Sequence, residues 1–357
     1  MYEFMSNLRV LLITFNCAEY PFKSYPFPHD VDTPPDILVF ALQEIGELGE
    51  SLRGPTKAIN GIENTIEEFK GKYNESYGEL LWSQAGTTAL VVYVKEGLPE
   101  LSVDMADIGV GFFGILGNKG AAAVRIHIPI EENDTTDVNT TKSITFVCAH
   151  LAAHGNMVTR RNEDFAMISR NLIFSDLTGM YDSDHLFFAG DLNYRTSDLI
   201  GSFDRVADEE ELLMELLESD QLKAEHSLGR TLHGLEEASI KFPPTFKFLK
   251  DGSGRYNTKR WPSWCDRILF LSKKIKIIRY DALLPIKHSD HRPVFLEALI
   301  ELSQNSRLNS LPHKENIEAR NIRRMVRQFE LTLGVGIQFA PFIAAAALAY
   351  IATRILF

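Results

Sequence analysis

The chain has 357 residues, of which 45% are hydrophobic, and a formal net charge of -11 at pH 7. This length and apolar content allow one large domain or two and exclude an intrinsically disordered protein. The acidic balance argues against a protein that mainly holds nucleic acid, because such a surface needs a broad basic field. We therefore expect a globular monomer with no nucleic-acid partner.

Apolar runs along the chain predict many strands and few helices. In the first half we expect strands at Leu8–Phe15, Asp36–Leu42, Thr87–Val94, Ala121–Ile128 and Ser143–Ala149, strand alternation over 101–108, and a helix at Ile62–Tyr73. In the second half we expect helices at Asn156–Phe174 and Glu209–Leu217, and strands at Leu186–Ala189, Cys265–Ser272, Ile275–Tyr280 and Val294–Leu302. This irregular alternation favours an α/β fold of two packed mixed sheets with helices outside, rather than a regularly wound βαβ fold.

The segment Phe187–Arg195 ends a buried strand and then places Asp191 and Asn193 at a tight strand exit. In phosphate ester hydrolysis, such a carboxylate takes a proton from the attacking water, and the amide holds that water or a phosphoryl oxygen in line. Gly-Asp-x-Asn is also a common turn sequence. The prediction therefore depends on the groups around it.

Polar residues come directly after a buried run or at its edge at five other places in the chain, namely Asn16, Glu44, His150, Asp266 and His291. The ends of neighbouring strands can meet at one rim of a sheet sandwich, so we expect these side chains to converge. Glu44 and Asn16 offer the hard oxygen ligands that suit Mg²⁺. Zinc is disfavoured, because the chain has no Cys-x-x-Cys or His-Glu-x-x-His spacing.

Two histidines are the expected contacts to a phosphoryl group. His150 and His154 are four residues apart, which also allows a helical metal pair, but the preceding strand favours His150 as a strand-exit donor. The charged turn around His291 implies a partner for this ring, and Asp266 is a natural one. A bonded carboxylate would raise the pKa of His291 and fix its tautomer, so that the ring can stabilise an anionic transition state.

Several basic residues are expected near the same rim: Lys119, Lys247, Lys259, Arg260 and Arg267. The glycines of Gly117–Gly120 let the backbone approach a phosphate closely, although this segment is neither a P-loop nor a dinucleotide fingerprint. On an acidic chain, these cations predict a locally basic pocket for a substrate with more than one phosphate.

Taken together, the chain resembles the inositol polyphosphate 5-phosphatases, a branch of the endonuclease, exonuclease and phosphatase superfamily with a DNase I-like four-layer sandwich. The signature motifs are Gly190–Arg195 and Pro262–Leu269, and supporting segments occur in the family order at Thr14–Asn16, Leu42–Glu44, Gly117–Gly120, His150–His154, Arg161–Asp164 and Ser289–Pro293. The resemblance covers the chain from about Leu8 to Leu302 and implies a catalytic domain over residues 1–302.

The resemblance also implies roles for the matching positions. The implied metal ligands are Glu44, Asn16 and Asp290, and the implied catalytic residues are Asp191, Asn193, His291, Asp266 and His150. The implied substrate-binding residues are Asn162, Lys119, Lys247, Arg260 and Arg267. Asn162 joins His150 at the 5-phosphate, and Lys247 and Arg260 read the 4-phosphate.

The chain departs from the family pattern at three aromatic positions. Phe15 and Phe188 stand where tryptophan is usual, which implies a change in packing. Phe246 stands where tyrosine is frequent, beside Lys247, so one polar contact to the 4-phosphate is missing. This departure bears on substrate preference more than on catalysis.

The composition changes after residue 302. Residues 303–330 are rich in Ser, Asn, Pro and charge, and predict a polar and basic linker. Residues 331–351 carry no charge, and as a helix they would span about 30 Å, enough for a bilayer core. The arginines before this run predict a single-pass transmembrane tail anchor with the catalytic domain facing the cytosol. A buried C-terminal helix is the alternative, which Gly334, Gly336 and Pro341 disfavour.

A phosphatase tethered in this way meets lipid headgroups at a high effective concentration. The expected reaction is the Mg²⁺-dependent hydrolysis of phosphatidylinositol 4,5-bisphosphate to the 4-phosphate. The short span favours a thin membrane such as the endoplasmic reticulum. Two alternatives stay open, a nuclease-like or sphingomyelinase-like phosphodiesterase on the same fold, and a catalytically inactive membrane-tethered phosphoinositide-binding module.

Overall fold

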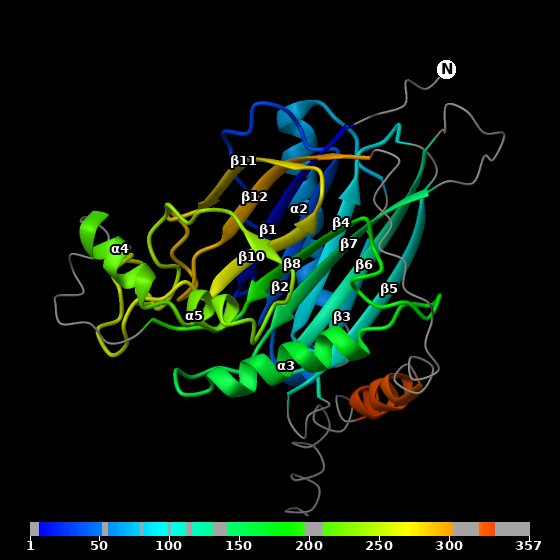
Figure 1. The fold of residues 1–357 in the computed structure, drawn as a ribbon. Helices are drawn as coiled ribbons and strands as arrows, with labels where there is room; N and C mark the ends of the chain where they lie inside the picture. Colours follow the sequence, from blue (N-terminus) through cyan, green and yellow to red (C-terminus); the bar gives the residue numbers. More distant parts are fainter. Residues whose placement is uncertain are drawn as a thin grey trace, which may run out of the picture.

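Two six-stranded sheets lie face to face, with helices against their outer faces (Figure 1). The computed structural model describes residues 7–51, 56–78, 81–98, 101–111, 116–130, 141–196, 210–302 and 321–332. Both sheets are mixed, because β1 and β2 are parallel in one and β7 and β8 are parallel in the other. The predicted α/β fold of two packed mixed sheets is confirmed.

The strands divide evenly between the two sheets. The first sheet has the order β11-β12-β1-β2-β4-β3 and contains β1 (Asn7–Asn16), β2 (Ile37–Gln43), β3 (Leu81–Ala85), β4 (Thr88–Val94), β11 (Ile275–Ala282) and β12 (Val294–Glu301). The second has the order β5-β6-β7-β8-β10-β9 and contains β5 (Ser102–Gly109), β6 (Gly120–Pro129), β7 (Thr141–His150), β8 (His185–Asp191), β9 (Glu236–Glu237) and β10 (Asp266–Ser272). The helices are α1 (Leu48–Ser51), α2 (Thr56–Tyr73), α3 (Val158–Asn171), α4 (Glu210–Glu218) and α5 (Gln221–Ser227), and residues 321–332 are also helical.

The long strands and helices lie where they were predicted, although α2 begins earlier, at Thr56, and the short elements α1, β3, α5 and β9 were not predicted. β3 is an edge strand that contains Ser83 and Gln84, so it has no long apolar run. α5 is short, and its N-cap is Asp220, whose carboxylate accepts a hydrogen bond from the backbone N–H of Lys223 at 2.9 Å. Residues 131–140, between β6 and β7, lie outside the described residues.

The buried side chains form layers that explain the apolar strands. Between the sheets lie residues such as Leu12, Val39, Phe146 and Phe187. Ile62, Ile66 and Phe69 of α2 pack on the outer face of the first sheet, and Phe165 and Ile168 of α3 pack on the outer face of the second. A strand covered on both faces is apolar throughout, which is why β1 and β2 are continuous hydrophobic runs. The cysteines Cys17, Cys148 and Cys265 are buried and free.

The register of the second sheet brings polar strand ends together. Asp191 at the end of β8 pairs with His150 on β7 and with Asp266 on β10. Gly190, just before Asp191, has φ 150°, and a Cβ there would lie 1.8 Å from the carbonyl oxygen of Ala149. Only glycine allows β7 and β8 to approach so closely at this point.

Part of the predicted linker is structured. Residues 321–332 form a helix in which Glu330 is fully buried. The Glu330 carboxylate accepts a hydrogen bond from the backbone N–H of Gly117 at 2.7 Å, and Arg323 Nε donates to both carboxylate oxygens of Asp107 at 3.0 Å. These contacts, which composition does not reveal, dock the helix on the catalytic domain. Residues 303–320 lie outside the described ranges.

The predicted tail anchor at 331–351 lies outside the described residues except for its first two positions. In the ranges that the structure covers, no helix has the length and apolar character needed to cross a membrane.

Candidate active site

Asp191 is the centre of a cluster of strand-end side chains, and it is almost completely buried. Its Oδ2 accepts a hydrogen bond from Asn16 Nδ2 at 2.9 Å and lies 3.2 Å from His150 Nε2 and 3.8 Å from His291 Nε2. Its Oδ1 accepts a hydrogen bond from the backbone N–H of Asn193 at 3.1 Å. Both sheets therefore contribute to one site, and the predicted convergence of strand exits is found.

The charges around Asp191 keep it ionised. Burial alone would raise the pKa of its carboxyl, but the charge of His291, the hydrogen bond from His150 and the charge of Lys119 together lower the pKa well below its usual range. Asp191 is therefore a carboxylate throughout the neutral pH range and can accept a proton or a hydrogen bond from a bound water.

His291 is held in one orientation by Asp266. Its Nδ1 lies 2.9 and 3.1 Å from the two carboxylate oxygens of Asp266, which also accepts a hydrogen bond from Thr245 Oγ1 at 2.7 Å. Burial works against the charged ring, but Asp266 and then Asp191 outweigh it and raise the pKa of His291 to about 9. The ring is therefore a cation at neutral pH, with Nε2 directed toward Asp191.

Replacing Asp266 with asparagine is expected to lower the pKa of His291 from about 9, because the main source of the upward shift is removed. The His291 ring is protonated below its pKa and loses its proton as the pH rises through that value. In the variant this loss should therefore occur at a lower pH than in the unmodified chain. A pH titration of the His291 ring resonance by NMR measures the change. An unchanged midpoint in the variant would mean that Asp266 does not set the charge of the ring.

His150 and Lys119 lie on another side of Asp191. Lys119 Nζ is 2.5 Å from His150 Nε2 and 3.3 Å from Nδ1. Burial and the charge of Lys119 lower the pKa of His150, and burial lowers the pKa of Lys119. A neutral imidazole beside an ammonium group is suited to donating hydrogen bonds to an anionic ligand.

Two hydrogen bonds hold the side chain of Asn193 in place. It adopts φ 57°, its Nδ2 donates to the carbonyl oxygen of Leu151 at 3.1 Å, and its Oδ1 accepts a hydrogen bond from Arg195. The amide keeps one hydrogen and one lone pair for a water or a phosphoryl oxygen. Arg195 also lies over the ring of Phe246, which packs at 4.4 Å between centroids against His291. Sequence reasoning did not assign Arg195 a place in the site, although it belongs to the signature motif.

Glu44 and Asn16 have the chemistry of magnesium ligands. The Glu44 carboxylate is 37% exposed, and its one ion pair among the described residues is with His150 Nε2 at 3.9 Å. Asn16 Oδ1 accepts one hydrogen bond, from the backbone N–H of Ala18 at 3.0 Å, so a second lone pair is available. Hard oxygen donors with room for retained waters are what Mg²⁺ requires.

A second possible ligand group consists of Asp191, Asp266 and His291, whose donor atoms lie within 4.8 Å of one another. Here the hydrogen bond between His291 and Asp266 explains the proximity. Because the raised pKa keeps His291 protonated, its ring nitrogens are poor metal donors.

Asp290 differs from its predicted role as a metal ligand. Its carboxylate oxygens lie 3.0 Å from Lys247 Nζ and 3.4 Å from Lys250 Nζ. Two lysines therefore compensate this charge, and the contacts argue against a ligand to a cation. Lys250 was missed by sequence reasoning, because a pairing within one irregular loop leaves no periodic signal.

The prediction that Arg267 binds substrate is wrong. Its guanidinium is buried and bonded to Asp220 at 3.0 Å and to Glu237 at 2.5 and 2.7 Å. Side chains alternate across a strand, so Arg267 on β10 faces away from its neighbour Asp266. Arg267 anchors α5 and β9 to the second sheet.

Replacing Arg267 with methionine is expected to lower the free energy of unfolding by about 3–5 kcal/mol, because Asp220 would be left buried and unpaired. Urea unfolding of both proteins measures the difference. The matched control is Arg279→Met, which removes an exposed pair with Asp30 and should cost less than about 1 kcal/mol. Equal losses in the two variants would contradict this structural role.

The remaining predicted substrate residues have no contact with Asp191 among those described. Asn162 donates to Glu225 at 2.7 Å and accepts from the Tyr194 hydroxyl at 2.7 Å. Arg260 is exposed. Their roles at a substrate stay predictions.

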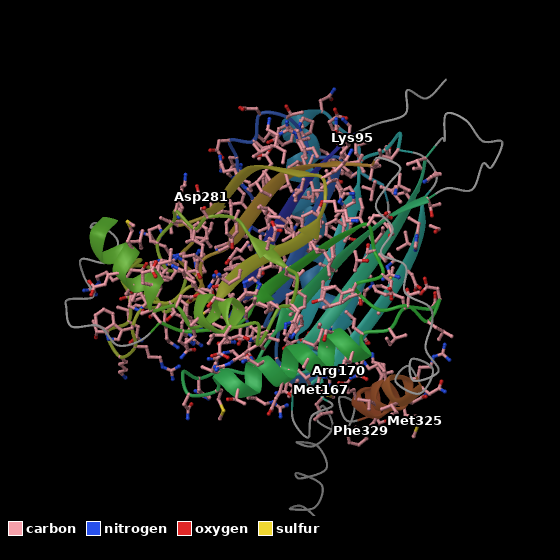
Figure 2. All side chains as sticks on the ribbon, viewed as in Figure 1. Lys95, Met167, Arg170, Asp281, Met325 and Phe329 are labelled. Carbon is pink, nitrogen blue, oxygen red and sulfur yellow. The ribbon has the colours of Figure 1, made fainter. Side chains whose placement is uncertain are left out.

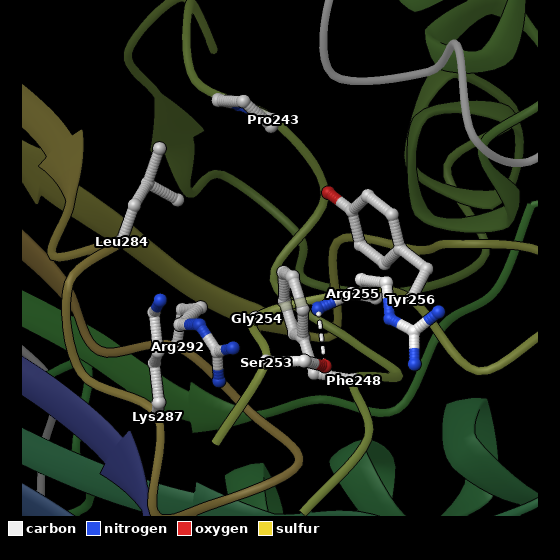
Figure 3. A pocket seen from close by; sticks show the side chains of 9 residues that line it. All are labelled: Pro243, Phe248, Ser253, Gly254, Arg255, Tyr256, Leu284, Lys287 and Arg292. Atoms are coloured by element: carbon white, nitrogen blue, oxygen red, sulfur yellow. Dashed lines mark hydrogen bonds between the residues drawn. The ribbon is translucent and has the colours of Figure 1, made fainter. Parts of the chain in front are cut away.

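A cavity of about 280 Å³ lies beside the segment that carries Lys247 (Figure 3). It is lined by Phe248, Tyr256 and the cations Arg255, Lys287 and Arg292, among others. None of its lining residues belongs to the Asp191 cluster. The cavity is therefore a separate hollow next to the catalytic groups.

Residues 13–297 match the family described as "Endonuclease/Exonuclease/phosphatase family 2". The chain belongs to this family. The match includes every residue of the Asp191 cluster, so the geometry above lies within the family's own domain. The predicted resemblance is confirmed.

Two curated relatives of this chain are named as phosphatases that act on inositol compounds. The chain is 31% identical over 303 residues to polyphosphatidylinositol phosphatase INP53 of Saccharomyces cerevisiae, covering 81% of this chain and 26% of that protein. It is 35% identical over 312 residues to the type II inositol 1,4,5-trisphosphate 5-phosphatase of Mus musculus, covering 82% of this chain and 30% of that protein. The chain thus spans about a third or less of the length of these relatives.

Two solved structures share the fold of this chain. The inositol polyphosphate 5-phosphatase domain of SPsynaptojanin, in complex with inositol (1,4)-bisphosphate and calcium ion, has a TM-score of 0.67 and 24% identity, over 96% of this chain and 93% of that one. A Cimex nitrophorin, solved as a ferrous NO complex, has a TM-score of 0.62 and 21% identity, over 84% of this chain and 100% of that one. Because a phosphatase domain and a nitrophorin share this fold, the function of this chain has to be argued from its site.

Proposed function

We propose that this chain is a Mg²⁺-dependent phosphoinositide 5-phosphatase, which removes the 5-phosphate of phosphatidylinositol 4,5-bisphosphate and is held at a membrane by its C-terminal tail. The observation that carries the proposal is the Asp191 cluster. An ionised aspartate lies between a protonated His291 and a neutral His150, with Asn16 beside it. The names and similarity of the relatives favour phosphoinositides as the substrate class.

In this mechanism the chain's own groups position the phosphate and move one proton. A water held by Asp191 and the free lone pair of Asn193 attacks phosphorus and gives a proton to Asp191. The new P–O bond forms as the bond to the inositol oxygen breaks, and that oxygen takes a proton from solvent water to become the hydroxyl, while Asp191 afterwards returns its proton to solvent. The cation of His291, held by Asp266, stabilises the charge on the phosphoryl oxygens. His291 Nε2 and Asp191 Oδ2 are 3.8 Å apart, close enough for one bound oxygen beside them to form hydrogen bonds with both.

Magnesium and the basic residues complete the site in this proposal. Glu44 and Asn16 would hold Mg²⁺, and bound magnesium polarises a phosphoryl oxygen as a Lewis acid. His150 and Lys119 would bind the 5-phosphate. Lys247, which is partly exposed beside Asp290, and Arg260 would read the 4-phosphate. The loss of a hydroxyl at Phe246 makes this second contact weaker than with tyrosine.

The membrane part of the proposal depends on residues 331–351 and the arginines before them. We propose a monomer with a single-pass tail anchor in the endoplasmic reticulum membrane and a catalytic domain that faces the cytosol. Deletion of residues 333–357 is expected to give an active enzyme that keeps the Glu330 contact and is washed from membranes by high salt, whereas the full chain requires detergent. Sedimentation of the truncated chain with membranes after a high-salt wash would mean that residues 331–351 are not the sole anchor.

A panel of substrates tests the reaction. Phosphate release is measured with Mg²⁺ on phosphatidylinositol 4,5-bisphosphate, phosphatidylinositol 4-phosphate, soluble inositol 1,4,5-trisphosphate, DNA and sphingomyelin. The proposal requires phosphate from the 5-phosphorylated substrates and none from phosphatidylinositol 4-phosphate. Cleavage of DNA or sphingomyelin instead would establish the phosphodiesterase alternative, and lipid binding without turnover would establish the inactive module.

A further inference from the structure

The helix at residues 321–332 turns apolar side chains toward solvent. Ile322, Met325 and Phe329 are 58%, 73% and 54% exposed. Their i, i+3, i+7 spacing puts them on one face of the helix, called here the apolar face. Figure 2 labels Met325 and Phe329 on this helix, at the edge of the molecule. A surface helix normally buries its apolar stripe, so this face requires a partner.

Charged residues hold the docked side of the same helix. Arg323 bonds Asp107 of β5 through both carboxylate oxygens, and its Nη1 lies 3.1 Å from Glu330. The buried Glu330 accepts from the backbone N–H of Gly117. Turning the apolar face inward would leave these buried charges unpaired, which costs more than the exposed apolar area would gain. The outward direction of the apolar face is therefore fixed.

The docked side also touches the active-site loop. Gly117 comes two residues before Lys119, whose ammonium group contacts His150 next to Asp191. The helix is thus joined by this hydrogen bond to the backbone segment that carries Lys119.

We propose that the apolar face lies in the interface of an anionic lipid bilayer and orients the active site toward membrane-bound substrate. This inference rests on the proposed function and identifies the surface through which the enzyme would reach its lipid substrate. Two observations favour a bilayer over a protein partner. Arg324 is also exposed on this helix, outside the apolar face, and a cation close to the bilayer surface is attracted to anionic lipid. The uncharged run 331–351 begins in the last two described residues of this helix.

Depth quenching in vesicles tests the contact directly. The full-length chain is reconstituted in phosphatidylcholine vesicles with phosphatidylserine, and it carries a fluorescent label at Met325→Cys or, as the matched control, at Met214→Cys. Met214 is 64% exposed on α4, and α4 and helix 321–332 lie at different ends of the molecule (Figure 1). The native cysteines are buried and will not label.

Nitroxide lipids should quench the label at 325 and leave the label at 214 bright. Equal, weak quenching at both positions would overturn the proposal. This readout needs no turnover, so it stays decisive even if the proposed reaction fails.

Turnover tests the orientation. Met325→Glu is expected to lower hydrolysis of phosphatidylinositol 4,5-bisphosphate in vesicles by about tenfold, the loss expected when one methionine side chain is no longer buried. Hydrolysis of soluble inositol 1,4,5-trisphosphate should not change, and Met214→Glu should change neither rate. Equal losses on lipid and soluble substrate, or no loss on lipid, would overturn the orienting role. Inactivity of the unmodified chain on both substrates would count against the proposed function alone.

Discussion

Replacing Asp191 with asparagine is expected to lower kcat for phosphate release from phosphatidylinositol 4,5-bisphosphate by about 100- to 10,000-fold, the range for loss of a general base. Asparagine keeps the shape of the side chain but cannot take a proton from water. Because His150, Asn16 and the backbone of Asn193 still surround the position, the fold should persist. Initial rates at saturating substrate and Mg²⁺ measure the effect.

The control for this experiment is Asp251→Asn, which removes an exposed carboxylate from the same domain. It should leave kcat unchanged, and thermal unfolding should show that both variants are folded. Normal kcat in Asp191→Asn would remove Asp191 as the base and with it the proposed mechanism.

Replacing Glu44 with glutamine is expected to raise the Mg²⁺ concentration for half-maximal activity by about 10- to 100-fold, since even loss of a contact that supports a metal ligand has effects of this size. The carboxylate supplies the only charge that the proposed ligand pair offers to the cation. Activity is titrated with Mg²⁺ for the unmodified chain and the variant.

Glu47→Gln removes an exposed carboxylate three residues further on and should leave the titration unchanged. If Glu44→Gln needs no more Mg²⁺ than the unmodified chain, Glu44 is not a ligand. If the unmodified chain is fully active in the presence of a metal chelator, the proposed requirement for magnesium is wrong.

Much of the fold was predictable because strands covered on both faces leave long apolar runs in the sequence. The residues after those runs were predictable as site residues for the same reason, since parallel neighbours end at a common edge. Asp191, His150 and Asp266 meet through the register of three adjacent strands. The pairing of His291 with Asp266 could also be anticipated, because a charged turn next to a strand needs compensation.

The predictions that differ from the structure concern contacts that motif membership and residue spacing do not reveal. Arg267 was grouped with the substrate cations because of its place in the signature, although strand alternation already separates it from Asp266. Asp290 was taken as a metal ligand because loop pairings such as those with Lys247 and Lys250 cannot be read from spacing. The docked helix was not predicted within this polar segment, because it is held by an ion pair with Asp107 and a hydrogen bond from the backbone N–H of Gly117 rather than by an apolar stripe.

The central claim is that the Asp191 cluster removes one particular phosphate from an inositol lipid. Its most direct test is to identify the products formed from phosphatidylinositol 4,5-bisphosphate in the presence of Mg²⁺. We predict phosphatidylinositol 4-phosphate and inorganic phosphate in equal amounts. Formation of phosphatidylinositol 5-phosphate, or release of the whole phosphorylated headgroup, would contradict the account.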